Sequence, residues 1–322
     1  MIRVGLTSIG GVTAAVFIKS LRLVEEEAFY IVGVDADKYA FGLKLVDKGY
    51  VIPLASEGEK YLRTLLGICK KERLDVLIPL MDEEMLTVVK ERDRFEEIGT
   101  RVALSPESAI SISLDKLKTF EKLGSEVFAN TIDASKYEDA TKLNYPIVLK
   151  PRSGRGSRDT YICQDELDFR AFKRRVTDPI IQEYLQEPEY TVDVFSDLRA
   201  RPLFAVPRRR IKVKAGVTWQ GIVERQPVIE KLCMYAAEKI GITGPSCIQV
   251  RYDKNGRPKI FEVNPRIGGT TILSVFAGAN IPYLTVKLFL DGTIVLPKKI
   301  TEGMLISRFF DEVIYTPSDP ER

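Results

Sequence analysis

The sequence predicts an α/β protein, with a parallel, doubly wound sheet at the N-terminus followed by a mixed α+β region. Short apolar runs alternate with amphipathic helical segments up to residue 105, which is the order of strands and crossover helices. The later strand signals instead flank short turns, which favours antiparallel hairpins. A chain of 322 residues is also too long for one small core and suits about two or three domains.

The N-terminal unit, residues 1–107, is predicted to be a Rossmann-like domain. A buried strand at 2–8, a glycine turn at Gly10 and Gly11 and an amphipathic helix at 12–23 open it. Further strands and helices follow in alternation, at 30–35, 50–54, 61–72, 74–79, up to about 98, and 101–105.

The glycine turn of this unit could be mistaken for that of a dinucleotide-binding fold. Asp35 ends the second strand, where a ribose-binding acid would lie, but the segment Gly-Leu-Thr-Ser-Ile-Gly-Gly lacks the Gly-x-Gly-x-x-Gly fingerprint. A tight turn between strand and helix explains the glycines better. Substrate binding by Ser8, Gly10 and Gly11 stays open, and the acidic loop 81–84 either faces the same cleft or forms a solvated helix start.

The composition indicates a globular protein of mixed charge. Hydrophobic residues make up 45% and charged residues 29%, and 48 basic against 45 acidic side chains leave a formal net charge of +3. So small a net charge gives no overall field that would attract nucleic acid. The chain has no histidine, which excludes mechanisms that use a histidine base or metal ligand.

The cysteines and the N-terminus indicate a cytoplasmic protein. The four cysteines are widely spaced, and without a Cys-x-x-Cys pair they give no zinc or redox signature. Reduced thiols are the default in the cytoplasm. The first residues lack the charged region and cleavage site of a signal peptide, and no apolar run approaches membrane length. We therefore expect no membrane association.

Residues 259–269, Lys-Ile-Phe-Glu-Val-Asn-Pro-Arg-Ile-Gly-Gly, carry the strongest chemical signal. Their first half is rich in strand formers, so Glu262 and Asn264 project from the same face of a strand. A carboxylate beside an amide oxygen suits a hard cation such as Mg²⁺. Pro265 ends the strand, and Arg266 supplies a planar fork for phosphate or carboxylate. This combination predicts phosphoryl chemistry.

A hairpin is predicted to pair this stretch with the strand before it. Residues 247–253 form a strand signal, and the turn at 254–258 contains Asn-Gly. Pairing across that turn would bring Gln249 near Glu262. An ordinary hairpin with a charged rim would explain an isolated Glu-x-Asn-Pro equally simply.

Phe-Glu-Val-Asn-Pro-Arg at 261–266 resembles the metal strand of the ATP-grasp superfamily, in the variant of the carbamoyl-phosphate synthetase large subunit and its single-module relatives. The resemblance implies that Gln249, Glu262 and Asn264 hold the metal. The D-alanine:D-alanine ligase branch has an aspartate where this chain has Gln249. The landmarks run in order from about residue 113 to residue 292.

The same resemblance implies a division into a pre-ATP-grasp domain and a two-lobed ATP-grasp fold. The boundaries are 1–107 for the first domain, 108–185 for the small lobe or lid, and 186–322 for the large lobe with the metal site. We see no internal repeat, so the expected unit is a single module.

A strand that ends in a lysine, followed by a glycine-containing basic loop, suits nucleotide phosphates. Residues 144–151 predict the strand, and the glycines of the loop 152–158 permit positive-φ turns that aim backbone N–H groups into one concavity. The loop lacks the Gly-Lys-[Ser/Thr] of a Walker motif, and a flexible surface hairpin is the alternative. The resemblance implies phosphate contacts by Lys116, Lys150, Ser153, Gly154, Gly156 and Ser157.

Residues 182–194 resemble the hinge of the ATP-grasp family. The resemblance implies that backbone groups of Glu183, Tyr184 and Leu185 read the adenine edge, while Glu189 accepts hydrogen bonds from the ribose hydroxyls. Taken alone, Glu183 is an ordinary strand residue.

Residues 208–218 are the most basic segment of the chain. If the segment is extended, alternation places four cations on one face: Arg208, Arg210, Lys212 and Lys214. Nucleic acid is disfavoured because only Trp219 is nearby for stacking. In the family a basic loop here approaches the triphosphate and the acyl phosphate, which implies catalytic roles for Arg210 and Lys212 beside Arg266.

The resemblance as a whole implies an ATP- and Mg²⁺-dependent carboxylate-amine ligase, with Mn²⁺ as an alternative ion. It would join small metabolites through an acyl phosphate and release ADP and phosphate, as in the ligase of the pyrrolysine pathway, which has a similar single-module layout. We expect small-molecule carboxylate and amine substrates, no nucleic acid and no membrane, and a homodimer stays open.

Two alternatives compete with the ligase. One is an enzyme that phosphorylates bicarbonate or carbamate in the manner of carbamoyl-phosphate synthetase, against which the absence of a second module and of a visible glutaminase counts. The other is a nucleotide-binding regulator without turnover. Intact residues at Glu262 and Asn264 count against a regulator, because a retired site need not keep them.

Overall fold

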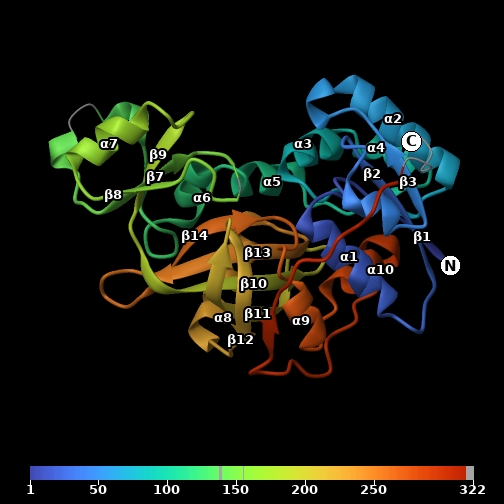
Figure 1. Cartoon of the computed structure of the whole chain (residues 1–322). Coiled ribbons are helices and arrows are strands. Elements are labelled where there is room, and N and C mark those ends of the chain that lie inside the picture. Colours follow the sequence, from blue (N-terminus) through green and yellow to red (C-terminus); the bar gives the residue numbers. More distant parts are fainter. Residues whose placement is uncertain (138–139, 155, 317–322) are drawn as a thin grey trace.

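The computed structural model of the protein describes residues 1–137, 140–154 and 156–316 (Figure 1). The predicted loop 152–158 is therefore described except for residue 155, and the predicted large lobe is described as far as residue 316. Three sheets organise these residues, of five, four and six strands. In this part of the chain no helix is both long enough and apolar enough to cross a bilayer.

The N-terminal sheet is parallel throughout and has the strand order β3-β2-β1-β4-β5. Its strands are β1 (Ile2–Leu6), β2 (Phe29–Asp35), β3 (Lys48–Val51), β4 (Val76–Ile78) and β5 (Arg101–Val102). Its helices are α1 (Val12–Arg22), α2 (Glu59–Glu72), α3 (Asp82–Lys90) and α4 (Arg92–Glu97). Side chains of α1 pack with one face of the sheet, and those of α2 and α3 with the other. The predicted doubly wound parallel sheet is confirmed.

A four-stranded antiparallel sheet forms the small lobe, in the order β6-β9-β7-β8. The strands are β6 (Thr131–Asp133), β7 (Ile147–Pro151), β8 (Tyr161–Cys163) and β9 (Pro179–Glu183), and α7 (Glu166–Lys173) packs against them through Phe169. Two helices, α5 (Glu107–Ser113) and α6 (Lys116–Leu123), lie between this lobe and the N-terminal unit (Figure 1).

The six-stranded sheet is antiparallel, in the order β14-β13-β10-β11-β12-β15. Its strands are β10 (Gln186–Ser196), β11 (Pro202–Lys214), β12 (Val217–Val223), β13 (Gly244–Tyr252), β14 (Pro258–Asn264) and β15 (Leu305–Ser307). Helix α8 (Pro227–Ile240) buries its apolar side against this sheet. The remaining helices are α9 (Ile272–Phe276) and α10 (Ile281–Asp291), and short 3₁₀ helices occur at Phe41–Lys44, Ala55–Glu57, Ala134–Lys136 and Ala140–Lys142.

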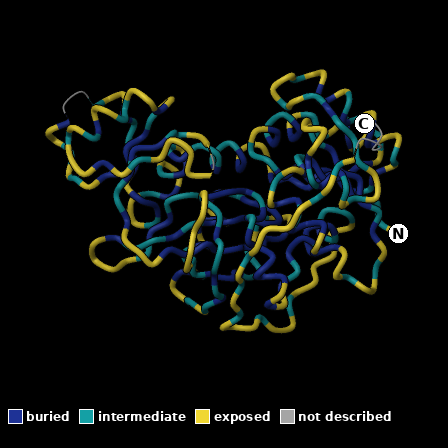
Figure 2. Tube along the Cα trace, viewed as in Figure 1, coloured by how far each residue is buried: buried dark blue, intermediate teal, exposed yellow. Residues whose placement is uncertain are grey.

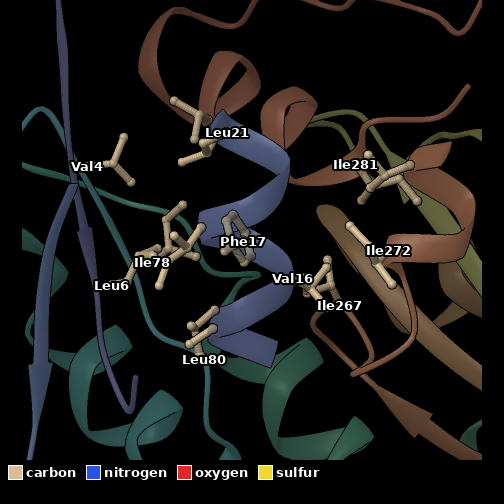
Figure 3. Close-up of a cluster of buried hydrophobic side chains, with 14 of the residues drawn as sticks. Val4, Leu6, Val16, Phe17, Leu21, Ile78, Leu80, Ile267, Ile272 and Ile281 are labelled. Atoms are coloured by element: carbon tan, nitrogen blue, oxygen red, sulfur yellow. The ribbon is translucent and has the colours of Figure 1, made fainter. Parts of the chain in front are cut away.

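The N-terminal unit and the six-stranded sheet share one hydrophobic core, with α1 at its centre (Figure 3). Phe17 of α1 lies toward Ile78 and Leu6, while Val16 lies toward Ile267 on the other side. Buried residues follow the strands, and exposed residues gather on the outer loops (Figure 2). The shared core fixes the end of β14 relative to the N-terminal unit. We retain the three-part division at residues 107 and 185 as a proposal.

Candidate active site

All the site residues predicted from the sequence except Lys212 line three adjoining cavities, which the small lobe, the six-stranded sheet and the N-terminal unit border. The first, here called the outer cavity, has a volume of about 460 Å³, and the second, the inner cavity, about 180 Å³. Arg210, Gln249 and Glu262 line both. A third, the side cavity of about 260 Å³, is lined by Asp82, Lys116 and Glu262 among others. Glu262 is thus the residue at which the three spaces meet.

The metal-facing residues are brought together by the register of β13 and β14. Gln249 is paired directly with Glu262, as the hairpin predicts. The Asn264 amide donates to Glu262 Oε1 at 3.0 Å and to the Cys247 carbonyl at 3.4 Å, which leaves Asn264 Oδ1 turned toward Arg266. Asn264 and Glu262 therefore present oxygens from neighbouring positions on one strand face.

This donor set fits Mg²⁺. Within the described residues Glu262 forms no ion pair, so its charge is available to a cation. The same part of the chain holds no group of three or more His, Cys, Asp or Glu residues that would make a protein-only metal cage. Mg²⁺ is usually held by one or two carboxylates together with substrate phosphates, and a single carboxylate with two amides matches that arrangement.

Lys150 is a buried cation on β7 that points at the metal strand. Its Nζ donates to the Phe261 carbonyl at 3.3 Å, and the side chain forms no ion pair within the described residues. Burial lowers the pKa of Lys150 to about 7, a shift that the charge of Glu262 opposes and that of Lys116 reinforces. A desolvated amine without a counter-ion is suited to receive an anion from the outer cavity, which it lines.

Lys116 lies at the first position of α6 and contacts the loop after β7. The carboxylate of Asp115 caps that helix and also pairs with Arg152 at 2.7 Å. The Lys116 ammonium donates to the Gly154 carbonyl at 3.2 Å, and its backbone N–H donates to the Arg152 carbonyl at 3.1 Å. The helix start and the glycine loop are therefore tied together, and Lys116 lines both the outer and the side cavity.

The predicted phosphate loop contributes to the lining of all three cavities. Gly154 and Gly156 have φ of 137° and 67°, and Ser157 has φ of 55°, so the loop uses the positive-φ turns that its glycines predicted. Gly154 and Ser157 line the outer cavity, Ser153 the side cavity and Gly156 the inner cavity. A Cβ at Gly216 would lie 3.0 Å from the Gly156 carbonyl, so the loop approaches the β11–β12 turn closely.

The part of the outer cavity at the end of β9 is here called the slot. Glu183, Tyr184 and Leu185 line it, and the apolar side chain of Phe261 lines the same cavity. The Glu183 side chain accepts from the Asn130 side-chain amide at 3.0 Å and its N–H donates to the Asn130 carbonyl at 2.8 Å, which anchors the hinge to the residue directly before β6. The slot has the apolar walls that a planar base needs.

Glu189, the predicted ribose acceptor, is buried and already paired through both oxygens. Oε1 accepts from Arg210, and Oε2 accepts from Arg251 at 2.6 Å. Glu187, which sequence reasoning missed, also lines the outer cavity and pairs with Arg251 at 2.9 Å, but its side chain is 65% exposed. Its position two residues before Glu189 was the signal that could have identified it. Arg251 carried no signal of its own.

The expectation that β11 places four cations on one face is wrong. The pairing of β11 with β12 is irregular between Arg210 and Lys212, so alternation breaks there. Arg208 turns inward to Asp193 at 2.7 Å, and Arg210 pairs with Glu189 and donates to the Gly216 carbonyl at 2.8 Å. Lys212 is exposed and, in the described part of the chain, lies outside the lining of all three cavities.

A buried network of hydrogen bonds and one ion pair, centred on Asp193, ties β11 to its neighbours. Asp193 pairs with Arg208, and its oxygens also accept from Thr271 Oγ1 at 2.8 Å and Ser274 Oγ at 2.6 Å. Both members of the ion pair are 2% exposed. The network joins β10, β11 and the segment after β14. Arg208 also donates to Thr270, which lines the inner cavity, so the network borders that cavity.

Arg266 lines the inner cavity and is held by a residue of the N-terminal unit. Its guanidinium pairs with Asp82 through contacts of 2.6 and 3.1 Å. Although burial opposes the shift, the ion pair with Asp82 raises the pKa of Arg266. Asp82 was visible in the sequence only as part of the acidic loop 81–84.

The N-terminal glycine turn is tied to the end of β2 and also borders the inner cavity. Asp35 accepts from the backbone N–H of Gly10 at 2.7 Å and of Asp37 at 2.9 Å, so its carboxylate is engaged in the turn. Gly11 does line the inner cavity, together with Val12 and other residues. The acidic loop does begin α3, where Glu83 is exposed, but it is not solvated throughout. Glu84 is buried, accepts from Tyr61 at 2.5 Å, and has its pKa raised by burial.

Two family models match the chain in the regions that build this site. One, described as ATP-grasp in the biosynthetic pathway with Ter operon, matches residues 175–309, and the other, described as PylC-like, N-terminal domain, matches residues 6–103. The chain is therefore similar to ATP-grasp proteins over residues 175–309. The ATP-grasp match includes Gln249, Glu262 and Asn264, so the resemblance first noted at the metal strand is confirmed.

Two curated proteins are similar in sequence to this chain. It is 21% identical over 178 residues to a carbamoyl-phosphate synthase of Methanobrevibacter smithii, covering 53% of this chain and 47% of that protein. It is 34% identical over 169 residues to a D-alanine--D-alanine ligase of Clostridium botulinum, covering 47% of this chain and 56% of that protein. The chain therefore spans about half the length of these curated relatives.

The fold of the chain is similar to that of solved structures. The L-amino acid ligase of Bacillus licheniformis superimposes with a TM-score of 0.72 at 19% identity, covering 91% of this chain and 75% of that one. At this level of identity the likeness establishes the fold, and it confirms the predicted architecture.

Proposed function

We propose that the protein is an ATP- and Mg²⁺-dependent carboxylate-amine ligase that joins small metabolites through an acyl phosphate. The observation that carries the proposal is the convergence at Glu262. A carboxylate without an ion-pair partner in the described residues, two amide side chains and the buried cation Lys150 meet where the outer and inner cavities join. The carboxylate suits a metal ion and the ammonium suits phosphate oxygens, so together they suit a metal-bound polyphosphate.

The outer cavity is proposed to hold ATP. The slot at Glu183, Tyr184 and Leu185 would take the base, and Glu187 is a more available acceptor for the ribose than Glu189, whose oxygens are engaged. Lys116, Lys150 and the loop residues Ser153, Gly154, Gly156 and Ser157 would receive the phosphates. Glu262, Asn264 and Gln249 would hold Mg²⁺, which offsets phosphate charge when bound.

The inner cavity is proposed to receive the acceptor substrate. A substrate carboxylate attacks the γ-phosphorus, which forms an acyl phosphate and releases ADP. An amine then attacks the acyl carbon and displaces phosphate, leaving an amide bond. Arg266 and Arg210 line this cavity and would stabilise the negative charge of the transferred group. This reaction depends on positioning and electrostatics, so a chain without histidine can perform it.

The test is Mg²⁺-dependent ADP release from ATP across pools of amino acids and other carboxylates, with product detection by mass. Release that requires a carboxylate pool, together with a condensation product, is the expected result. The Glu262→Gln variant is the control, because the amide keeps the shape of the side chain and removes its charge.

A parallel assay with bicarbonate distinguishes the ligase from the second candidate function, an enzyme that phosphorylates bicarbonate. The match to a carbamoyl-phosphate synthase favours testing bicarbonate phosphorylation directly. ADP release with bicarbonate alone, without any amino acid, would replace the ligase proposal.

We also propose a cytoplasmic location and a homodimer for the ligase. Light scattering of the purified protein checks the homodimer.

A further inference from the structure

The ion pair between Asp82 and Arg266 joins two parts of the chain that are 184 residues apart. Asp82 is the first residue of α3 in the N-terminal unit, and Arg266 follows the metal strand β14. The two carboxylate oxygens face Nε at 2.6 Å and Nη2 at 3.1 Å, so the contact is bidentate. Both side chains are largely buried, with 14% and 13% exposed.

The hydrogen bonds of Arg266 leave one donor for a ligand. A guanidinium carries five N–H groups. Nε and Nη2 donate to Asp82, Nη2 also approaches Asn264 Oδ1 at 3.5 Å, and Nη1 donates to the Ile267 carbonyl at 3.2 Å. Four of the five N–H groups are therefore directed to protein oxygens, and one on Nη1 is left in a side chain that lines the inner cavity.

Asp82 itself sits on a rigid support. Glu84, two residues further along α3, accepts from the backbone N–H of Leu80 at 3.0 Å and of Met81 at 2.9 Å. Its other oxygen accepts from Tyr61 at 2.5 Å, so the start of α3 is fixed to α2 and to the loop after β4. The carboxylate of Asp82 thus has a defined position before any substrate arrives.

We propose that Asp82 is a positioning residue for the transfer step, one that orients the Arg266 guanidinium from the N-terminal unit so that its free N–H serves the inner cavity. The inference rests on the proposed function for its kinetic consequence. It adds that the N-terminal unit completes the catalytic geometry of the metal strand as well as forming a wall of the inner cavity. Loss of Asp82 should then slow turnover more than it weakens nucleotide binding.

The chain offers a matched control for this ion pair. Lys287 of α10 pairs with Glu27 of the N-terminal unit at 2.9 Å, and these side chains are 15% and 29% exposed. This second pair also links the N-terminal unit to the C-terminal part of the chain, and within the described residues neither member lines the outer, inner or side cavity. The Glu27–Lys287 pair thus joins the same two parts of the chain as the Asp82–Arg266 pair, but it lies away from the cavities.

The experiment compares Asp82→Asn and Asp82→Glu with Glu27→Gln in the full chain. We expect Asp82→Asn to lower kcat about 10- to 100-fold while KM for ATP changes less than about threefold, since misplacement of a charge-stabilising group costs rate. Asp82→Glu, which keeps the charge, should recover part of that loss. Glu27→Gln should lower the melting temperature at most, with kcat unchanged.

A second measurement decides the inference without turnover. The Arg266 Nε–H resonance, assigned with Arg266→Lys, should exchange slowly with water in the wild type and rapidly in Asp82→Asn. An unchanged kcat in Asp82→Asn, an equal kcat loss in Glu27→Gln, or a slowly exchanging resonance in Asp82→Asn would each overturn the inference. If no substrate pool supports ADP release by the wild type, the proposed function fails, and the resonance alone decides whether Asp82 orients Arg266.

Discussion

Strands β14 and β11 belong to the same sheet and both carry predicted site residues, yet only β14 presents them as the sequence pattern predicts. On β14 the two-residue spacing of Glu262 and Asn264 and the Asn-Gly turn were enough, because pairing across a short hairpin is fixed locally. On β11 the irregular pairing between Arg210 and Lys212 sends neighbouring cations to different environments. Alternation is a reliable guide only between residues over which the pairing register does not shift, as from Glu262 to Asn264 on β14.

The two strands also differ in how their charges are satisfied. Glu262 on β14 has no ion-pair partner in the described residues, while Arg208 and Arg210 on β11 are both paired with buried carboxylates. The first arrangement costs stability and leaves a charge for a ligand. The second holds the sheet together. Substitutions on the two strands should therefore separate activity from stability.

The largest expected effect is on β14. Glu262→Gln should reduce ADP release more than about 100-fold, because the amide cannot supply the charge that a hard cation requires. Nucleotide binding should survive in part, since Lys116, Lys150 and the apolar slot remain. Parallel measurements of ADP release and of ADP binding by calorimetry check this. Turnover close to that of the wild type would remove the metal assignment.

On β11 the corresponding large effect is on folding. Arg208→Met should lower the free energy of unfolding by about 3 kcal/mol, since it leaves the Asp193 carboxylate buried without its cation. Thr271 and Ser274 still donate to Asp193, which places the cost at the lower end of the usual range. Urea denaturation measures the change.

A double variant tests that reasoning. Adding Asp193→Asn to Arg208→Met should recover part of the lost stability, because the buried charge disappears together with its partner. Additive losses from the two substitutions would show that the pair is not the source of the effect.

The sequence predicted the sheets and the metal strand because their signals are local. Strand and helix alternation, the hairpin turn and the lysine at the end of β7 each lie within about ten residues of what they determine. The partners of Arg266, Glu189 and Arg208 lie much further away in the chain or across strands. Asp82 is 184 residues from Arg266, and no spacing rule links an acidic helix start to an arginine after a distant strand.

Burial explains why Glu84 and Glu189 lie in environments other than those the sequence predicted. Glu84 and Glu189 looked like exposed or ligand-facing acids, but both are buried and engaged by protein donors. Sequence composition cannot separate an acid that faces solvent from one that caps a helix internally or neutralises an arginine. That distinction depends on tertiary packing, which here comes from the core shared by the N-terminal unit and the six-stranded sheet.

A smaller effect should appear as a pH dependence of ADP affinity, caused by Lys150, which faces β14. The free protein holds Lys150 with a pKa of about 7, among Glu262, Lys116, Arg251 and Glu189. Bound phosphates raise that pKa, so binding takes up a proton once the pH exceeds about 7. ADP affinity should therefore fall as pH rises from 7 to 9, where the nucleotide phosphates are already ionised.

Calorimetry in two buffers of different ionisation enthalpy would detect the proton uptake by the wild type. Lys150→Met should bind ADP about tenfold more weakly and lose both the pH dependence and the uptake. A variant that keeps the wild-type pH profile would show that another group titrates.

The smallest effect should separate the two sides of the irregularity in β11. Arg210→Met removes a cation that lines both the outer and the inner cavity and frees an oxygen of Glu189, so we expect kcat to fall about tenfold. Lys212→Met changes an exposed side chain and should lower kcat several-fold less. Steady-state rates at saturating ATP compare the two. An equal or larger loss in Lys212→Met would mean that β11 shifts its register when substrates bind, because only a regular strand brings residues 210 and 212 to the same face.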